Sequence, residues 1–166
     1  MVGIDSSPTL IGLADEAGGY EQLVCADAAA LPFEAGEFGL AVAYMSLQDV
    51  DDLDRVVAQA RVLEPAGRLC IAIPHPLNRG AGALDDYFEE RRFAEEFGRD
   101  GLRMTFERID RPLEAYTRAL SRAGFLIEQL REPRATAAAV AAAPRLARAA
   151  KRPCFLHLRC ALAADR

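Results

Sequence analysis

Short apolar runs alternate with amphipathic segments in the first part of the chain. Val2–Asp5 is an apolar run that ends in an acid, and Leu23–Ala26 is a second run, followed directly by Asp27. A third run, Phe38–Tyr44, is apolar without interruption, so we expect a buried strand there. Strands that alternate with helices build a mostly parallel sheet with helices on both faces. The pattern therefore predicts an α/β fold.

Helix signals occupy the intervals between these runs. Pro8–Ala17 follows Ser6 and Ser7, either of which can cap a helix, and it ends at Gly18-Gly19. The predicted helices farther along the chain are Asp51–Leu63, Leu113–Ala123 and an alanine-rich segment that is interrupted by Pro144.

Three further strands are predicted in the remaining sequence, at Arg68–Ile73, Phe125–Leu130 and Cys154–Leu162. In the last one, polar and apolar positions alternate, which is typical of an antiparallel strand with one polar face. We therefore expect a single domain over residues 1–166, with one antiparallel strand near its end.

Residues 77–110 interrupt the alternating pattern and are rich in charge, so we interpret them as an excursion or lid. The part that spans 84–97 carries Tyr87, Phe88, Phe93 and Phe97. Aromatic residues at this spacing fit the inner face of a helical lid over an apolar molecule. They fit an amphipathic helix packed on the sheet equally well.

Composition excludes several classes of protein. The chain has 166 residues, of which 51% are hydrophobic and 27% charged, which is typical of a globular domain. No apolar run approaches the roughly 20 residues of a membrane span, and no signal peptide is recognisable. We therefore expect a cytoplasmic protein with no membrane partner.

Charge is unevenly distributed, but its balance does not favour nucleic-acid binding. Residues 1–60 hold eleven acids and one base, whereas residues 134–166 hold seven bases and one acid. The net charge of −5 argues against binding along a phosphate backbone. We expect the basic tail to be a solvated helix.

The four cysteines, which form no CxxC pair, are Cys25, Cys70, Cys154 and Cys160. We interpret them as small core residues and not as disulfide partners or zinc ligands. No metal site is predicted.

The order of motifs resembles that of class I S-adenosylmethionine-dependent methyltransferases that act on small molecules. The best segments are VGIDSSPTLIGLA (2–14), ADAAALPFEAGEFGLAVAYMSLQDVDD (26–52) and ARVLEPAGRLCIAIPHP (60–76). The resemblance extends to about Leu162. It implies a Rossmann-like sheet, S-adenosyl-L-methionine as cofactor and a small-molecule methyl acceptor.

One part of the family pattern is not found in this sequence. In the family, a first strand and a glycine-rich loop lie mid-sheet, between the strands that correspond to residues 1–5 and 38–44. Without that strand, two backbone edges would lack partners, which invites association and a possible homo-oligomer. Three explanations stay open: a misassigned or truncated start, closure of the two strands on each other, and a partner chain that completes the sheet.

The resemblance assigns cofactor-binding roles to residues at strand ends. Asp5 would accept hydrogen bonds from a ribose diol, a device that dinucleotide-binding folds share, although an acid there can also serve the following helix. Asp27 and Ala28 would bind adenine, with Ser6 and Leu31 lining the pocket. Asp27 could instead simply form a turn.

The remaining candidates face the methyl group or the acceptor. Tyr44 is expected near the sulfonium, whose positive charge an aromatic face favours, or in the core. Met45 and Tyr87 are candidate substrate contacts, Met45 with packing as its alternative. His75, fixed between two prolines at a strand end, is a candidate general base or a structural turn residue.

Three functions are compatible with these residues. The first is methyl transfer to a small molecule, and the second is a non-catalytic methyltransferase-like module that acts through dimerisation or partner binding. A dinucleotide oxidoreductase is disfavoured because the chain lacks a GxGxxG motif.

Overall fold

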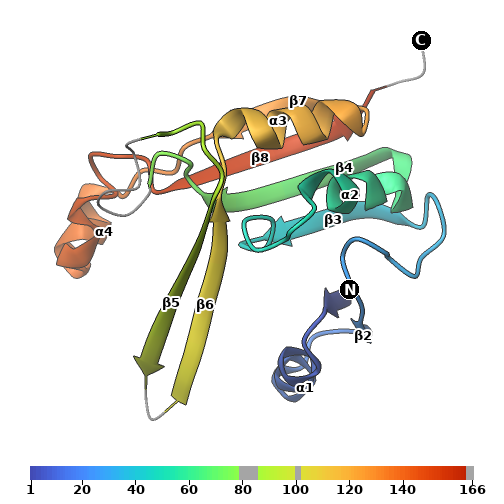
Figure 1. Cartoon of the computed structure of the whole chain (residues 1–166), viewed down its shortest axis with the longest axis horizontal. Coiled ribbons are helices and arrows are strands. Elements are labelled where there is room, and N and C mark those ends of the chain that lie inside the picture. Colours follow the sequence, from blue (N-terminus) through green and yellow to red (C-terminus); the bar gives the residue numbers. More distant parts are fainter. Residues whose placement is uncertain (79–85, 100–101, 164–166) are drawn as a thin grey trace.

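A computed structural model describes residues 1–78, 86–99 and 102–163 (Figure 1). The strands are β1 (Val2–Asp5), β2 (Gln22–Cys25), β3 (Phe38–Tyr44), β4 (Leu63–Pro74), β5 (Arg91–Arg99), β6 (Leu102–Asp110), β7 (Phe125–Arg131) and β8 (Phe155–Leu162). The helices are α1 (Pro8–Ala17), α2 (Leu53–Ala58), α3 (Leu113–Arg122) and α4 (Ala137–Ala142), with 3₁₀ turns η1 (Gln59–Val62) and η2 (Pro144–Ala147).

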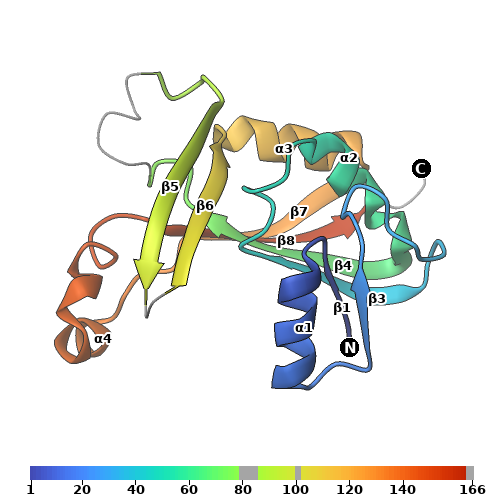
Figure 2. The ribbon, with the colours of Figure 1, turned by 60° about the horizontal axis from the view of Figure 1, so that its bottom comes forward.

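In the described part of the chain the strands form three separate sheets. β1 and β2 make a parallel pair in which Asp5 lies opposite Cys25. The main sheet has the order β3-β4-β8-β7: β3 and β4 are parallel, whereas β8 is antiparallel to both of its neighbours. β5 and β6 form an antiparallel hairpin (Figures 1 and 2). In the described residues β1 and β3 do not pair, so closure of these two strands on each other, one of the three open explanations, does not occur.

Local signals account for α1. Ser7 caps the helix, its hydroxyl accepting a hydrogen bond from the Leu10 amide at 3.4 Å. Pro8 stands at the first helical position, where no amide donor is needed. Gly18 ends the helix with a φ of 71°, a conformation that costs a glycine little. The predicted bounds of this helix are confirmed.

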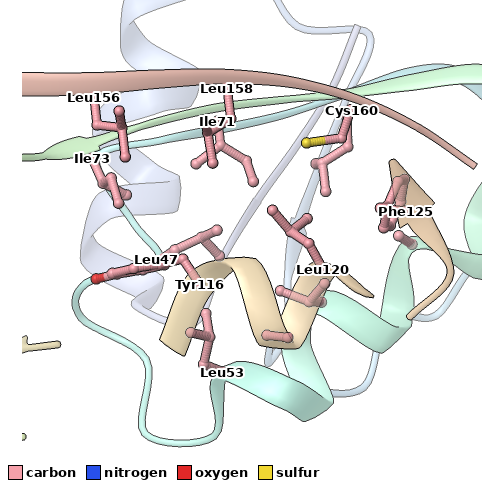
Figure 3. Packing of buried hydrophobic residues seen from close by; sticks show 14 of the residues in the cluster. Leu47, Leu53, Ile71, Ile73, Tyr116, Leu120, Phe125, Leu156, Leu158 and Cys160 are labelled. Atoms are coloured by element: carbon pink, nitrogen blue, oxygen red, sulfur yellow. The ribbon is translucent and has the colours of Figure 1, made fainter. Parts of the chain in front are cut away.

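The core lies between the main sheet and the helices α2 and α3 (Figure 3). The inward side chains of β8 are fully buried and alternate with exposed ones, which confirms the predicted antiparallel strand with one polar face. From α3, Tyr116 and Leu120 point into the same cluster, at 4% and 1% exposure. Burial of such side chains contributes roughly 1.5–3 kcal/mol each.

The expected burial of β3 is wrong for one of its faces. Ala41 and Ala43 pack against the core, but Leu40, Val42 and Tyr44 are 57%, 64% and 73% exposed. The cause is the position of the helices, since α2 and α3 lie on only one face of the main sheet (Figures 1 and 2). Although its apolar run is continuous, β3 therefore has one apolar face that neither α2 nor α3 covers.

The predicted helical lid is wrong, because the charged excursion forms the hairpin β5–β6. Alternate positions along β5 lie on opposite faces, and the Phe93 ring contacts the guanidinium of Arg108 across the hairpin at 4.4 Å. Residues 79–85 and 100–101 lie outside the described part, as does the side chain of Phe97. The start of the predicted lid helix at residue 84 therefore cannot be compared.

The helix predicted over Asp51–Leu63 is shorter than expected. α2 begins after Asp52, whose carboxylate accepts the Arg55 amide, and it becomes the 3₁₀ turn η1 at Gln59. None of the helices in the described part of the chain has the length and apolar character that a bilayer crossing requires. The four cysteines are free thiols; Cys160 is buried as expected, whereas Cys25 is exposed and does not belong to the core.

Candidate functional site

Asp5 and Asp27 lie at the same end of two neighbouring parallel strands. Asp5 ends β1 opposite Cys25, and Asp27 comes two residues after Cys25. Each carboxylate closes a turn of its own by accepting a hydrogen bond from the amide two residues farther along the chain. Asp5 Oδ1 accepts from the Ser7 amide at 2.8 Å, and Asp27 Oδ1 accepts from the Ala29 amide at 2.8 Å. A carboxylate has about four acceptor sites, so each retains capacity for a ligand's hydroxyl or amino group.

A cavity of about 750 Å³ begins at Asp5 and extends between β1 and β3. We call it the β1–β3 cavity. Its walls are mainly apolar, and Leu31, Tyr44 and Ser46 line it together with Asp5. Its volume lies within the range of about 300–1,000 Å³ that is usual for small-molecule sites.

A second apolar cavity, of about 220 Å³, adjoins the first. Ala28 lines it, and Ile4, Leu31, Val42 and Ser46 line both cavities. The two cavities therefore share part of their walls, near the ends of β1 and β3. Of the residues that sequence reasoning placed in one pocket, Asp5 lines the first cavity, Ala28 lines the second and Leu31 lines both, whereas Asp27 lines neither.

The turn after β3 has an unusual backbone. Met45 has a φ of +51°, which is uncommon for a residue other than glycine, and its amide donates to the Ala72 carbonyl at 2.7 Å. Strained backbone of this kind occurs preferentially at functional sites. The turn leaves the Tyr44 ring exposed at the cavity, so the core alternative for Tyr44 does not apply.

Both ring nitrogens of His75 are engaged. Its Nδ1 accepts the Leu77 amide at 3.1 Å, and its Nε2 lies 2.9 Å from Glu132 Oε1. The side chain is 6% exposed, and it does not line the β1–β3 cavity. This geometry matches the structural-turn alternative more closely than that of a base with a free nitrogen.

Tyr87 also has a structural contact. Its hydroxyl accepts the backbone amide of Leu113 at 2.8 Å, and so it satisfies a donor in the first turn of α3. The ring packs edge-on against that of Phe88, with 5.3 Å between centroids.

Sequence reasoning missed a polar cluster under the loop that follows β3. Gln48 is 3% exposed and donates from Nε2 to Asp49 Oδ2 at 3.0 Å. Burial raises the pKa of Asp49 to about 6, although the Gln48 amide and the charge of Arg108 act in the opposite direction. Within the described residues, Gln48 Oε1 is buried without a hydrogen-bond partner.

Arg111 connects this loop to α3. Its side chain is 3% exposed, and its Nη2 donates to the carbonyls of Val50 at 2.7 Å and Asp51 at 3.0 Å. Tyr116 interacts with Arg111, and its own burial raises the pKa of its hydroxyl to about 12. No local sequence pattern indicates this cluster, because Arg111 and the loop that it contacts are about 60 residues apart in the sequence.

Comparison with known proteins shows what this chain is similar to. Residues 1–71 match the family model described as a methyltransferase domain. A solved structure from Listeria monocytogenes, assigned to the S-adenosylmethionine-dependent methyltransferases, superposes with a TM-score of 0.79 at 16% identity, covering 98% of this chain and 79% of that chain. The chain has a class I methyltransferase fold. The fold class expected from the sequence is thereby confirmed, and the family model matches the resemblance over residues 1–71.

Two other solved methyltransferases show the same relationship to this methyltransferase-like chain. The S-adenosylmethionine-dependent methyltransferase from Mesorhizobium loti has a TM-score of 0.71 at 24% identity, covering 96% of this chain and 79% of that chain. The one from Methanosarcina mazei has a TM-score of 0.70 at 18% identity, covering 99% and 82%. No curated protein matches the chain in sequence.

Proposed function

We propose that the chain binds the adenosyl group of S-adenosylmethionine at the ends of β1, β2 and β3 and transfers its methyl group to a small molecule. The observation that carries the proposal is the position of Asp5 and Asp27 at one end of adjacent parallel strands, where Asp5 lines the larger of two apolar cavities. Open α/β sheets bind ligands outside the carboxyl ends of their strands.

The donor set of the site fits this cofactor. In the proposal, the Asp5 carboxylate accepts hydrogen bonds from the ribose diol, and Asp27 accepts one from the adenine amino group. The Ala29 and Ala30 amides already bond to Asp27, to its Oδ1 and its main-chain oxygen. In the described part of the chain the Ala28 amide has no acceptor, so it is suited to donate to the adenine ring.

The cofactor supplies an activated methyl group when it is bound, so the chain needs no nucleophile of its own. The task of the protein is then alignment and exclusion of water, for which effective molarity contributes about 7–11 kcal/mol. Leu31 and Val42 present apolar walls to the ligand, and the exposed Tyr44 ring offers an aromatic face to a positive sulfonium.

Two similar structures define the range of chemistry that this fold supports. The glycopeptide N-methyltransferase MtfA was solved with S-adenosylmethionine bound, and its TM-score to this chain is 0.60 at 16% identity. The [4+2]-cyclase SpnF has a TM-score of 0.63 at 21% identity. The fold alone therefore does not determine the reaction, and the acceptor has to be found experimentally.

A non-catalytic, partner-binding module is the second candidate. The observation that favours it is the open space between β1 and β3, which leaves the proposed cofactor site without a strand along one side. In that case the chain would retain the fold without binding the cofactor.

Equilibrium dialysis with labelled S-adenosylmethionine distinguishes the two candidates. We expect saturable, micromolar binding that falls at least tenfold in Asp5→Ala and in Asp27→Ala. Asp15→Ala, which removes an exposed acid from α1, is the matched control and should bind as the wild type does. Absence of binding by the wild-type chain would favour the non-catalytic module, and equal affinities in all variants would refute the site.

A further inference from the structure

Five bases in the segment that joins β7 to β8 lack an acidic partner. They are Arg134, Arg145, Arg148, Lys151 and Arg152. All five are exposed but lie outside the helix α4, so they do not form the solvated basic helix that we expected from the sequence. None of them forms an ion pair within the described part of the chain, whereas Arg68, Arg122 and Arg159 are each paired with an acid. A chain of net negative charge thus has an excess of unpaired positive charge at this place.

A cavity of about 430 Å³ lies between the two ends of this segment. Residues 132–134, which follow β7, form one wall, and residues 149–153, which precede β8, form the other. The Ala135 amide donates a hydrogen bond to the Ala149 carbonyl at 3.1 Å and so joins the two walls. Each wall also contains a proline, which restricts its backbone. These features preform the cavity, which we call the β7–β8 cavity.

The β7–β8 cavity is lined by three of the five bases, Arg134, Lys151 and Arg152. Arg134 Nε donates to the Ala150 carbonyl in the opposite wall at 2.8 Å, which leaves the terminal nitrogens of the guanidinium for a ligand. The acid that lines the cavity is Glu132, whose Oε1 lies 2.9 Å from His75 Nε2, so this carboxylate is already engaged. The lining therefore has more positive than negative charge, which favours an anionic ligand.

The β7–β8 cavity lies at the same end of the main sheet as the proposed cofactor site. Because β8 is antiparallel to both β4 and β7, the strands β3, β4 and β7 all end at one edge (Figure 1). Tyr44, Ala72, His157 and Arg131 stand in one row across the four strands. With about 4.8 Å between strands, Arg131 lies roughly 14 Å from Tyr44. The β7–β8 cavity shares no lining residue with the two cavities at β1 and β3, so a ligand there would not compete with the cofactor.

We propose that the β7–β8 cavity binds a small phosphate ester through its phosphate group. At pH 7 a phosphate monoester carries a charge of about −1.5 to −2 and three acceptor oxygens, which matches three bases around one cavity. Guanidinium groups form paired hydrogen bonds with phosphate oxygens, and lysine adds a point charge. The proposal does not depend on cofactor binding.

The rest of the lining indicates a small organic body on the phosphate. The other lining residues are apolar, namely Pro133, Ala149, Ala150 and Pro153. The volume of about 430 Å³ exceeds that of a phosphate group and lies within the usual range of small-molecule sites. Bases around a cavity favour such a ligand over a membrane or a polyanion, which bind along an open face.

Calorimetric titration of the full chain with phenyl phosphate tests the proposal. We expect saturable one-to-one binding with a dissociation constant below about 1 mM. Benzoate, which carries a single charge on two oxygens, should bind at least about tenfold more weakly. In a parallel nuclear magnetic resonance titration with phenyl phosphate, the amide signals of residues 134 and 149–152 should shift, whereas those of α1 should not.

Two double variants of equal charge separate a local site from general electrostatic attraction. Lys151→Gln with Arg152→Gln removes two bases from the cavity lining and should weaken phenyl phosphate binding at least about tenfold. Both side chains are exposed, so the variant should fold as the wild type does. Arg145→Gln with Arg148→Gln removes the same charge from exposed positions that do not line the cavity, and it should change the affinity by less than about twofold.

Several outcomes would overturn the proposal. They are the absence of saturable phenyl phosphate binding, equal affinity for benzoate, shifts of amide signals away from the cavity walls, and equal weakening by the two double variants. Vesicles that contain phosphatidylglycerol and a poly-glutamate peptide complete the set of probes. Binding of either one without binding of phenyl phosphate would also overturn the proposal, because the bases would then serve a membrane surface or an acidic polypeptide.

Discussion

The contacts of Arg111 with the loop after β3 allow a direct test of what stabilises this loop. Replacing Arg111 with Met removes two short hydrogen bonds, to the Val50 and Asp51 carbonyls, and an ion pair with Glu90 at 3.3 Å. Hydrogen bonds to a charged group contribute about 1.5–3 kcal/mol each, which gives about 3–6 kcal/mol for the pair. Because water can rehydrate part of the exposed loop and Met refills part of the volume, we expect a loss near the lower end, about 3 kcal/mol.

Urea unfolding followed by circular dichroism measures this loss. With a denaturant dependence of about 2 kcal/mol per molar urea, the midpoint should fall by roughly 1.5 M. Arg118→Met is the matched control: its ion pair with Glu114 is exposed and 3.8 Å long, so it should cost less than 1 kcal/mol. Equal losses in the two variants would refute the assigned role of Arg111.

Three further predictions concern stability. Leu120→Ala removes most of a side chain that is 1% exposed, so the free energy of unfolding should fall by about 2–5 kcal/mol in the same urea assay. A loss below about 1 kcal/mol would contradict the described core. Tyr87→Phe should cost about 1 kcal/mol, since the Leu113 amide loses its acceptor; an unchanged midpoint would count against that bond. Because the folded-state pKa of Asp49 is raised from 3.8 to about 6, the native state binds its proton first as the pH falls. The wild type should therefore gain stability relative to Asp49→Asn between pH 7 and pH 5, and a constant difference between their urea midpoints would contradict the raised pKa.

The elements that depend on local chemistry were predictable from sequence. Ser7, Pro8 and Gly18 define α1 through capping, fixed φ and a left-handed end, and each signal acts within a few residues. The alternation in β8 predicted both its buried face and its antiparallel pairing. Asp5 and Asp27, placed at strand ends by the sequence pattern, lie at the same end of two neighbouring strands because β1 and β2 are parallel.

Features that depend on distant contacts were not predictable. The apolar face of β3 is exposed because no described helix packs on it, and a sequence run does not record what covers it. The contacts of Arg111 with the loop after β3 connect residues about 60 positions apart, so no pattern within one segment indicates them.

The central claim is that Asp5 and Asp27 hold the sugar and the base of one adenosyl group. Calorimetry tests it directly when S-adenosylhomocysteine is compared with two analogues, one lacking a ribose hydroxyl and one with the adenine amino group replaced by oxygen. Against the wild type, each change should weaken binding by roughly tenfold to a hundredfold. The missing hydroxyl should have no further effect in Asp5→Ala, nor the replaced amino group in Asp27→Ala. If each loss instead persists undiminished in its paired variant, the two carboxylates do not contact these groups.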